Sequence, residues 1–131
     1  MPAPCDAIHI LSGPSKHLHF VLCAPRTMYA RGSTLYIVLA NLTTLDPNAK
    51  YDPACIVDVG DHPFVDRRSY IAYRFLRFES VPYTSDMVEQ GQWTLDTPCS
   101  AALLARMTAG LCASKLVDRG VKYMFKCPGV I

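Results

Sequence analysis

Residues 34–42 have the sequence TLYIVLANL, which is the strongest strand signal in the chain. β-Branched and aromatic side chains favour an extended backbone, and they fill much of this stretch. Apolar residues at nearly every position indicate a strand that is covered on both faces or lies centrally in a barrel. The stretch therefore predicts the middle strand of a sheet.

Four other stretches have the composition or the alternation of short strands. They are residues 8–11 (IHIL), 17–23 (HLHFVLC), 55–59 (CIVDV) and 69–78 (SYIAYRFLRF). In the last stretch, alternation predicts one face with Ile71, Tyr73 and Phe75, and an opposite face with Tyr70, Ala72, Arg74 and Leu76. We expect turns or loops between these strands.

The later third of the chain has helical patterns. Thr97 and Pro98 are suited to an N-cap and a first helical position. After them, Leu103, Leu104, Met107 and Leu111 have helical spacing, and Gly110 is a candidate break or kink. Residues 121–127 (VKYMFKC) predict a short helix, with a strand as the alternative, and residues 79–97 predict a mixed loop.

Strands followed by helices predict an α+β fold, a small curled sheet or barrel with C-terminal helices. The length of 131 residues predicts a single domain over residues 1–131. Within it we expect a partly irregular arm (1–16), a strand-rich barrel (17–80) and the helices (97–127).

Composition narrows the class of protein. Half of the residues are apolar and 18% are charged, which excludes a disordered chain. The net charge of +2 does not by itself indicate a nucleic-acid partner. The six cysteines include no CxxC pair, so we expect free, mostly buried thiols, no metal or other cofactor, and a reducing cytoplasm. No apolar run is long enough to predict a membrane span, so we expect no membrane partner.

The densest run of chemically active residues is GDHPFVDRRSYIAYRFLR, residues 60–77. His62 is the first candidate for proton transfer, because imidazole exchanges a proton near neutral pH. Asp61 and Asp66 would orient it. The alternatives are a histidine that caps a turn and two ordinary turn carboxylates.

The same run contains the arginines Arg67, Arg68, Arg74 and Arg77. Arg74 and Tyr70 are expected on one strand face, where a guanidinium and a phenol ring would hold a phosphate and stack a base. The alternative is a solvated face on which the arginines pair with carboxylates.

Two further groups lie near strand ends. Lys16, His17 and His19 form a basic cluster that would line a substrate groove, remain exposed, or supply two ligands of a metal site that lacks an evident third. Asn41, Thr43 and Thr44 follow the central strand and would hold a phosphate or cap a turn.

The order of these pieces resembles the PemK/MazF-like family of small barrel toxins and their uncharacterised relatives, which include proteins of mobile elements. The resemblance lies in residues 16–22 (KHLHFVL) and residues 37–44 (IVLANLTT). It implies an SH3-like barrel with added helices, often a homodimer, and metal-independent RNA cleavage by an arginine and a threonine. These two places correspond to Lys16 or His17 and to Thr43 or Thr44, whereas the glycine- and aspartate-rich opening of the toxins is missing.

The first hypothesis is therefore an endoribonuclease toxin of a toxin–antitoxin pair. His62 or His17 would transfer the proton, Lys16 and Arg74 would stabilise the phosphorane, and Thr43 and Tyr70 would position the backbone. The alternative is a non-catalytic module that binds protein or nucleic acid, or a phage-type inhibitor of a host enzyme. The expected partners are RNA, an antitoxin or host enzyme, or a second copy of the chain.

Overall fold

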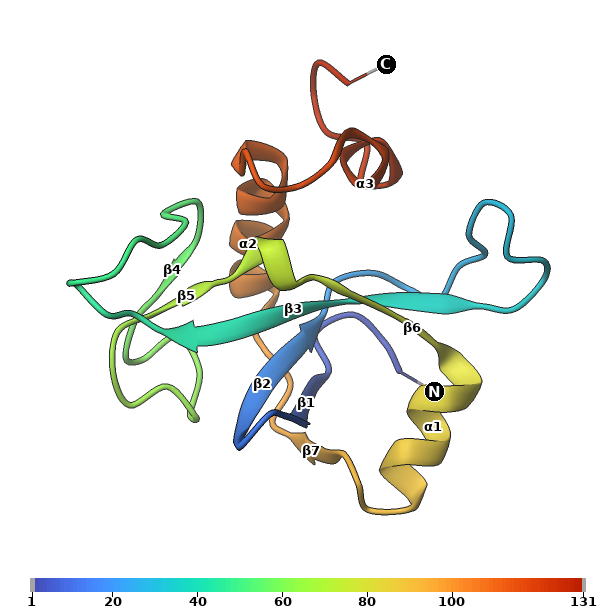
Figure 1. The fold of residues 1–131 in the computed structure, drawn as a ribbon, viewed down its shortest axis with the longest axis horizontal. Helices are drawn as coiled ribbons and strands as arrows, with labels where there is room; N and C mark the ends of the chain where they lie inside the picture. Colours follow the sequence, from blue (N-terminus) through green and yellow to red (C-terminus); the bar gives the residue numbers. More distant parts are fainter. Residues whose placement is uncertain (1, 131) are drawn as a thin grey trace.

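The computed structural model describes residues 2–130 and has a mixed α+β fold (Figure 1). Its strands are β1 (Ala7–Ser12), β2 (Ser15–Val21), β3 (Tyr36–Thr44), β4 (Ile56–Val57), β5 (Ser69–Ile71), β6 (Arg77–Ser80) and β7 (Thr94–Asp96). Its helices are η1 (Tyr73–Phe75, a 3-10 turn), α1 (Val81–Glu89), α2 (Ala101–Ala113) and α3 (Arg119–Met124). The predicted α+β class is confirmed.

All strand pairs are antiparallel, and β3 is the central strand as the sequence predicts. The order is β4-β5-β3-β2-β1-β7, and β6 also pairs with β3. Among the strands that the structure describes, β4 and β7 are the two ends of this order. The sheet is therefore open, and these strands do not form a closed barrel.

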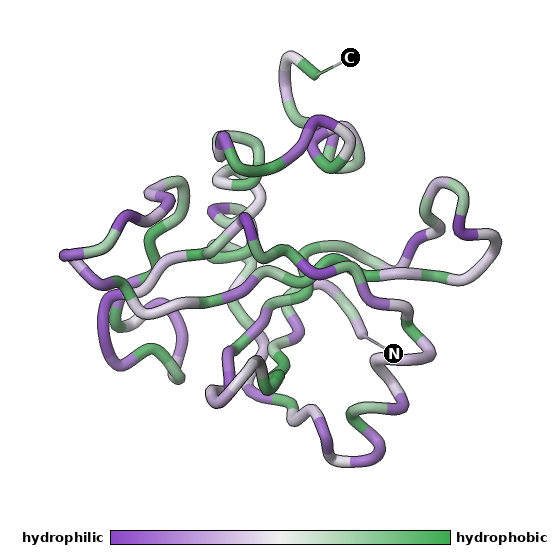
Figure 2. The backbone as a smooth tube through the Cα atoms, in the orientation of Figure 1, coloured by the Kyte–Doolittle hydropathy of each residue, from purple (hydrophilic) through white to green (hydrophobic). Residues whose placement is uncertain are grey.

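Alternate residues of β3 pack on opposite faces of the sheet. Val38, Ala40 and Leu42 belong to a core with α2 and α3, whereas Ile37 and Leu39 pack with residues of α1 and with Trp93. Figure 1 shows α2 and α3 on one side of β3 and α1 on the other. Figure 2 shows the hydrophobic stretch along β3 and more hydrophilic loops beyond its end. The prediction of a strand covered on both faces is confirmed.

The prediction of one strand over residues 69–78 is wrong. The extended backbone stops at Ala72, and the 3-10 turn η1 follows. Tyr73 is buried there, and its hydroxyl donates a hydrogen bond of 2.6 Å to the carbonyl of Met107 in α2. Because Tyr73 is drawn into the core, β5 pairs with the end of β3 and β6 pairs with its start.

The expected loop over residues 79–97 is also wrong, because it contains α1 and β7. The Ser80 side chain caps α1 by accepting from the backbone N–H of Tyr83, and Pro82 lies in the first turn. β7 pairs with β1, so part of the expected irregular arm is a strand inside the sheet. The strand β7 therefore depends on its pairing with β1, which local composition does not show.

Helix α2 begins after the predicted Thr97–Pro98 start. Ser100 is its N-cap and accepts a hydrogen bond of 3.0 Å from the backbone N–H of Leu103. Thr97 and Cys99 make backbone hydrogen bonds to other parts of the chain, which keep this segment extended. Helix α3 begins two residues before the 121–127 segment and covers its first half, so the predicted short helix is confirmed and the strand alternative is wrong.

Gly110 does not break α2, which continues through it to Ala113. A Cβ atom at this position would lie 2.9 Å from the Ala54 carbonyl oxygen and 2.9 Å from Cys55 Cβ, and it would also collide with the Tyr73 hydroxyl. Glycine is therefore needed for the close approach of α2 to these segments.

The cysteine prediction is wrong for two of the six residues. Cys112, in α2, and Cys127, after α3, form a disulfide with a Cα separation of 5.3 Å. Cys5, Cys23, Cys55 and Cys99 are free thiols. The pair was missed because sequence spacing does not report distance between helices. Over the described part of the chain, no helix has both the length and the apolar character needed to cross a membrane.

Candidate functional site

The sheet face that packs on α1 is apolar at one end and polar at the other. Cross-strand pairing places Val21 opposite Leu39 and His19 opposite Asn41. His17 lies two residues before His19 in β2, and Thr43 lies two residues after Asn41 in β3. These polar side chains continue a face whose apolar half is covered, because side chains two residues apart in a strand share a face.

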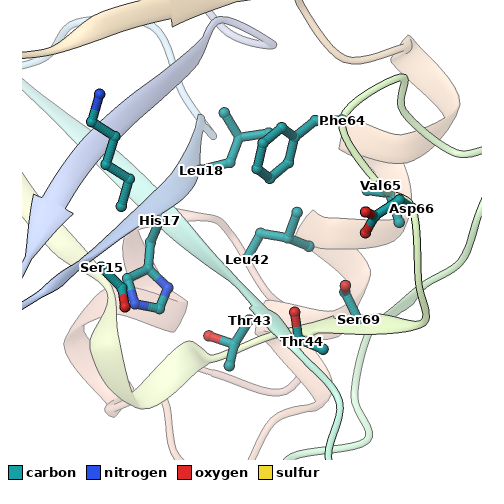
Figure 3. A pocket seen from close by; sticks show the side chains of 11 residues that line it. Ser15, His17, Leu18, Leu42, Thr43, Thr44, Phe64, Val65, Asp66 and Ser69 are labelled. Atoms are coloured by element: carbon teal, nitrogen blue, oxygen red, sulfur yellow. The ribbon is translucent and has the colours of Figure 1, made fainter.

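Two cavities adjoin at His17 and Thr43, which line both of them. The first, with a volume of about 350 Å³, includes Lys16 and is named the Lys16 cavity. The second, with a volume of about 550 Å³, includes Arg74 and is named the Arg74 cavity. Figure 3 shows His17 and Thr43 on adjacent strands around the Lys16 cavity. We call the two cavities together the His17–Thr43 groove.

A chain of hydrogen bonds runs beneath the groove. The His19 Nδ1–H donates to the His17 carbonyl at 3.0 Å, because a carbonyl oxygen only accepts. His19 Nε2 then accepts from the Asn41 amide at 3.5 Å. The Thr43 hydroxyl donates to Asn41 Oδ1 at 2.6 Å. The lone pairs of Thr43 Oγ1 are therefore left to accept a hydrogen bond from a ligand.

His19 is a neutral member of this chain. It is 1% exposed, and burial lowers its pKa to about 4, against an opposing effect of the hydrogen bond to the His17 backbone. The positive charge of Arg77 lowers the pKa further. Since both ring nitrogens are engaged, His19 orients Asn41 and Thr43 and does not exchange protons with a ligand at neutral pH.

His17 differs from His19 in its surroundings. It is half-buried and lines both cavities. Within residues 2–130 its ring makes no hydrogen bond, whereas its carbonyl holds His19. The imidazole of His17 is therefore open to a ligand in the groove.

The two arginines of the Arg74 cavity differ in whether a carboxylate compensates their charge. Arg77 donates from Nε and Nη2 to one oxygen of Glu79, at 3.0 and 2.6 Å, so its charge is largely compensated. Arg74 is exposed, packs 4.5 Å from the Phe75 ring centroid and makes no ion pair among the described residues. Its planar guanidinium is suited to a phosphate.

An anion is better placed near Arg74 than near Lys16. Of the residues that the structure describes, no acidic one lines the Arg74 cavity. Asp66 lines the Lys16 cavity, and its carboxylate lies 3.4 Å from the Nε of Arg67. The Arg74 cavity therefore has the more positive lining, and Lys16 lies on the far side of His17.

His62 does not line the groove. Its position therefore does not fit the proton-transfer role that the sequence predicts for it. It is 3% exposed and packs edge-on against Phe20. Its Nε2–H donates to the Thr97 carbonyl at 2.6 Å, and its Nδ1 accepts from the Phe64 N–H at 3.0 Å. Because both nitrogens hold backbone groups, His62 ties the 60–65 turn to the segment before α2, as in the turn-capping alternative.

The other predicted site residues are distributed differently. Thr44 lines the Lys16 cavity, as Figure 3 shows, and Tyr70 and Arg74 are joined by a separate cavity described below. Arg67 and Arg68 are exposed and lie near Asp66 and Asp58, so the solvated ion-pair alternative describes both. The two arginines do not line the groove.

Sequence reasoning missed the His19–Asn41–Thr43 hydrogen-bond chain as a unit. The available signal was three polar residues at alternate positions of two apolar strands, which register brings side by side. The alternative of a metal pair at His17 and His19 does not fit, because both nitrogens of His19 are engaged. Comparison of the chain with protein-family models, curated proteins and solved structures finds no match.

Proposed function

We propose that this protein binds the phosphodiester backbone of RNA in the His17–Thr43 groove and cleaves it without a metal ion. The observation that carries the proposal is the common wall of the two cavities: His17 and Thr43 lie in one site with Arg74. RNA transesterification needs a base, a proton source for the leaving oxygen and a cation at the phosphate, and His17 and Arg74 would supply the base and the cation.

The positive charge of Arg74 would attract the RNA phosphate. A phosphate in the Arg74 cavity would accept hydrogen bonds from the Arg74 guanidinium, whose charge no described carboxylate compensates. Thr43 Oγ1 would accept a hydrogen bond from the ribose 2′-hydroxyl, because its own proton is already donated to Asn41. This contact favours RNA over DNA at the same position.

His17 would act as the general base. After the 2′-hydroxyl turns its proton from Thr43 Oγ1 to the imidazole, His17 would remove that proton while the 2′-oxygen forms a bond to phosphorus and the bond from phosphorus to the 5′-oxygen breaks. The departing 5′-oxygen takes a proton from water, which gives a 2′,3′-cyclic phosphate and a 5′-hydroxyl. Arg74 would stabilise the additional negative charge on the phosphorane.

The resemblance to PemK/MazF-like toxins supports the same site. Its basic position corresponds to Lys16 or His17 and its threonine to Thr43 or Thr44, and all four residues line one cavity. Membership of that family, its SH3-like barrel, an antitoxin or host-enzyme partner and a homodimer are parts of this proposal.

A second candidate function is RNA binding without cleavage. One observation favours it: of the described histidines, only His17 offers an uncommitted ring to the groove, so no second histidine can serve there as the general acid. Such a protein would hold RNA through Arg74 and Thr43 and leave it intact.

The test is incubation of the purified protein with a mixed RNA pool in EDTA, together with titration of RNA binding against salt. We expect fragments with 5′-hydroxyl ends, loss of cleavage in His17→Ala, and weaker binding with a salt slope reduced by about 1 in Arg74→Ala. Arg119→Ala removes another exposed arginine, from α3, and should change neither result.

Three outcomes separate the alternatives. Cleavage that depends on His17 supports the nuclease. Intact RNA with binding that depends on Arg74 favours the binding protein. Absence of RNA binding at low salt, or binding that Arg74→Ala and Arg119→Ala weaken equally, refutes the proposed site.

A further inference from the structure

Strand register extends the groove beyond Thr43. β5 pairs with the end of β3, and Tyr70 lies directly opposite Thr43. Residues opposite each other in antiparallel strands point to the same face, with Cβ atoms about 4.5–5.5 Å apart. Tyr70 therefore stands beside the oriented hydroxyl of the groove, on the side away from His17.

A second aromatic ring lies against Tyr70. Tyr51, from the connection between β3 and β4, has its ring centroid 5.5 Å from that of Tyr70, with an angle of 46° between the rings. Tyr51 is 39% exposed and Tyr70 is half-buried, so neither ring is enclosed by the core. Aromatic rings in this condition are available to a flat apolar ligand.

The two rings line a third cavity, with a volume of about 190 Å³, which we name the Tyr51–Tyr70 cavity. Arg74 lines both this cavity and the Arg74 cavity. Lys50 adds a second cation, and the carboxylate of Asp52 is engaged by the Ala54 N–H and the Ser114 hydroxyl. An anion held by Arg74 would thus lie between a ribose-binding hydroxyl and a pair of partly exposed rings.

We propose that the Tyr51–Tyr70 cavity is a nucleobase subsite that takes an unpaired base next to the phosphate at Arg74. The proposal rests on the proposed function and names its substrate class, which is single-stranded RNA. Bases inside a duplex are stacked on one another and cannot reach a tyrosine pair, whereas bases of a single strand stack on aromatic side chains.

The test uses RNA oligomers in which every 2′-hydroxyl is methylated, so that binding is measured without cleavage. One oligomer carries its bases, and a second of equal length and charge is abasic. We expect the base-bearing oligomer to bind wild-type protein roughly 5- to 150-fold more tightly, the range that stacking of one base provides. A duplex of the same sequence should bind no better than the abasic strand.

Substitution assigns the preference to the rings. Tyr70→Ala and Tyr51→Ala should each weaken binding of the base-bearing oligomer and leave the abasic oligomer unchanged. Tyr70→Phe keeps the ring and should keep most of the preference. Tyr29→Ala is the matched control, because Tyr29 is 99% exposed in the loop before β3, at the opposite end of that strand from β5.

The results separate the subsite from the groove. If both oligomers bind equally and Tyr70→Ala changes neither, the nucleobase subsite is overturned while the proposed phosphate site stands. If neither methylated oligomer binds and unmethylated RNA does not bind either, the proposed function and the subsite fall together; if only unmethylated RNA binds, the subsite alone is overturned. If Tyr29→Ala reduces the preference as much as Tyr70→Ala does, the assignment to this cavity is refuted.

Discussion

The Gly110→Ala substitution tests the packing that places the candidate site. Gly110 lies where α2 meets Tyr73, and Tyr73 directly precedes Arg74 of the groove. On an exposed helix, alanine in place of glycine would stabilise by about 1 kcal/mol. Here the new methyl group would lie 2.9 Å from the Ala54 carbonyl oxygen and would collide with the Tyr73 hydroxyl.

The magnitude follows from two costs that oppose the gain in helix propensity. Overpacking of a close contact costs about 1–3 kcal/mol. The Tyr73 hydroxyl must also move away from the Met107 carbonyl, to which it donates at 2.6 Å, and loss of such a buried hydrogen bond costs about 1–3 kcal/mol. We therefore expect Gly110→Ala to lower the free energy of unfolding by about 3 kcal/mol.

The assay is urea denaturation followed by the fluorescence of Trp93, which is the single tryptophan and is buried. Gly120→Ala in α3 is the matched control, since a Cβ there meets only Asp118 Oδ1 at an ordinary 3.5 Å. It should be neutral or stabilising by up to about 1 kcal/mol.

A double-mutant cycle identifies the collision. Tyr73→Phe removes the oxygen that the new methyl group meets, so it should cost clearly less in the Gly110→Ala background than alone. If Gly110→Ala is as stable as Gly120→Ala, or if the two effects simply add, then α2 does not pack on Tyr73 as described and the anchoring of η1 is wrong.

Two further predictions concern titration and the thiols. Since the pKa of His19 is about 4 in the folded protein and 6.5 in the reference state, the stability it contributes is complete above about pH 6.5 and is lost toward pH 4. Between pH 6.5 and pH 4 the free energy of unfolding of the wild-type protein, measured by urea denaturation, should fall by about 3 kcal/mol because of His19, and this fall should be absent from His19→Gln. The same pH dependence of stability in both proteins would contradict the prediction. The denatured, unreduced protein should give four thiols with Ellman's reagent and not six. Cys112→Ser with Cys127→Ser should cost about 3 kcal/mol, because the bridge closes a 15-residue separation; full stability of this variant would count against the bridge.

Local pattern determined several parts of this protein correctly. The apolar run around β3 predicted the central strand and its two covered faces, since burial on both sides requires apolar residues at consecutive positions. Helical spacing of Leu103, Met107 and Leu111 predicted the buried side of α2. The sequence also drew attention to His17, Thr43 and Arg74, because polar residues at strand ends are accessible to ligands.

Tertiary structure decided the rest. Alternation predicted one strand through Tyr73, but the contact with α2 turned the backbone there and moved Arg74 to the edge of the groove. The neighbours of His62 in sequence predicted a catalytic role, whereas its hydrogen bonds to Phe64 in the same turn and to Thr97 in a distant segment make it a buried structural residue. Sequence fixes which side chains are present, whereas burial and the pairing of distant strands fix which of them a ligand can reach.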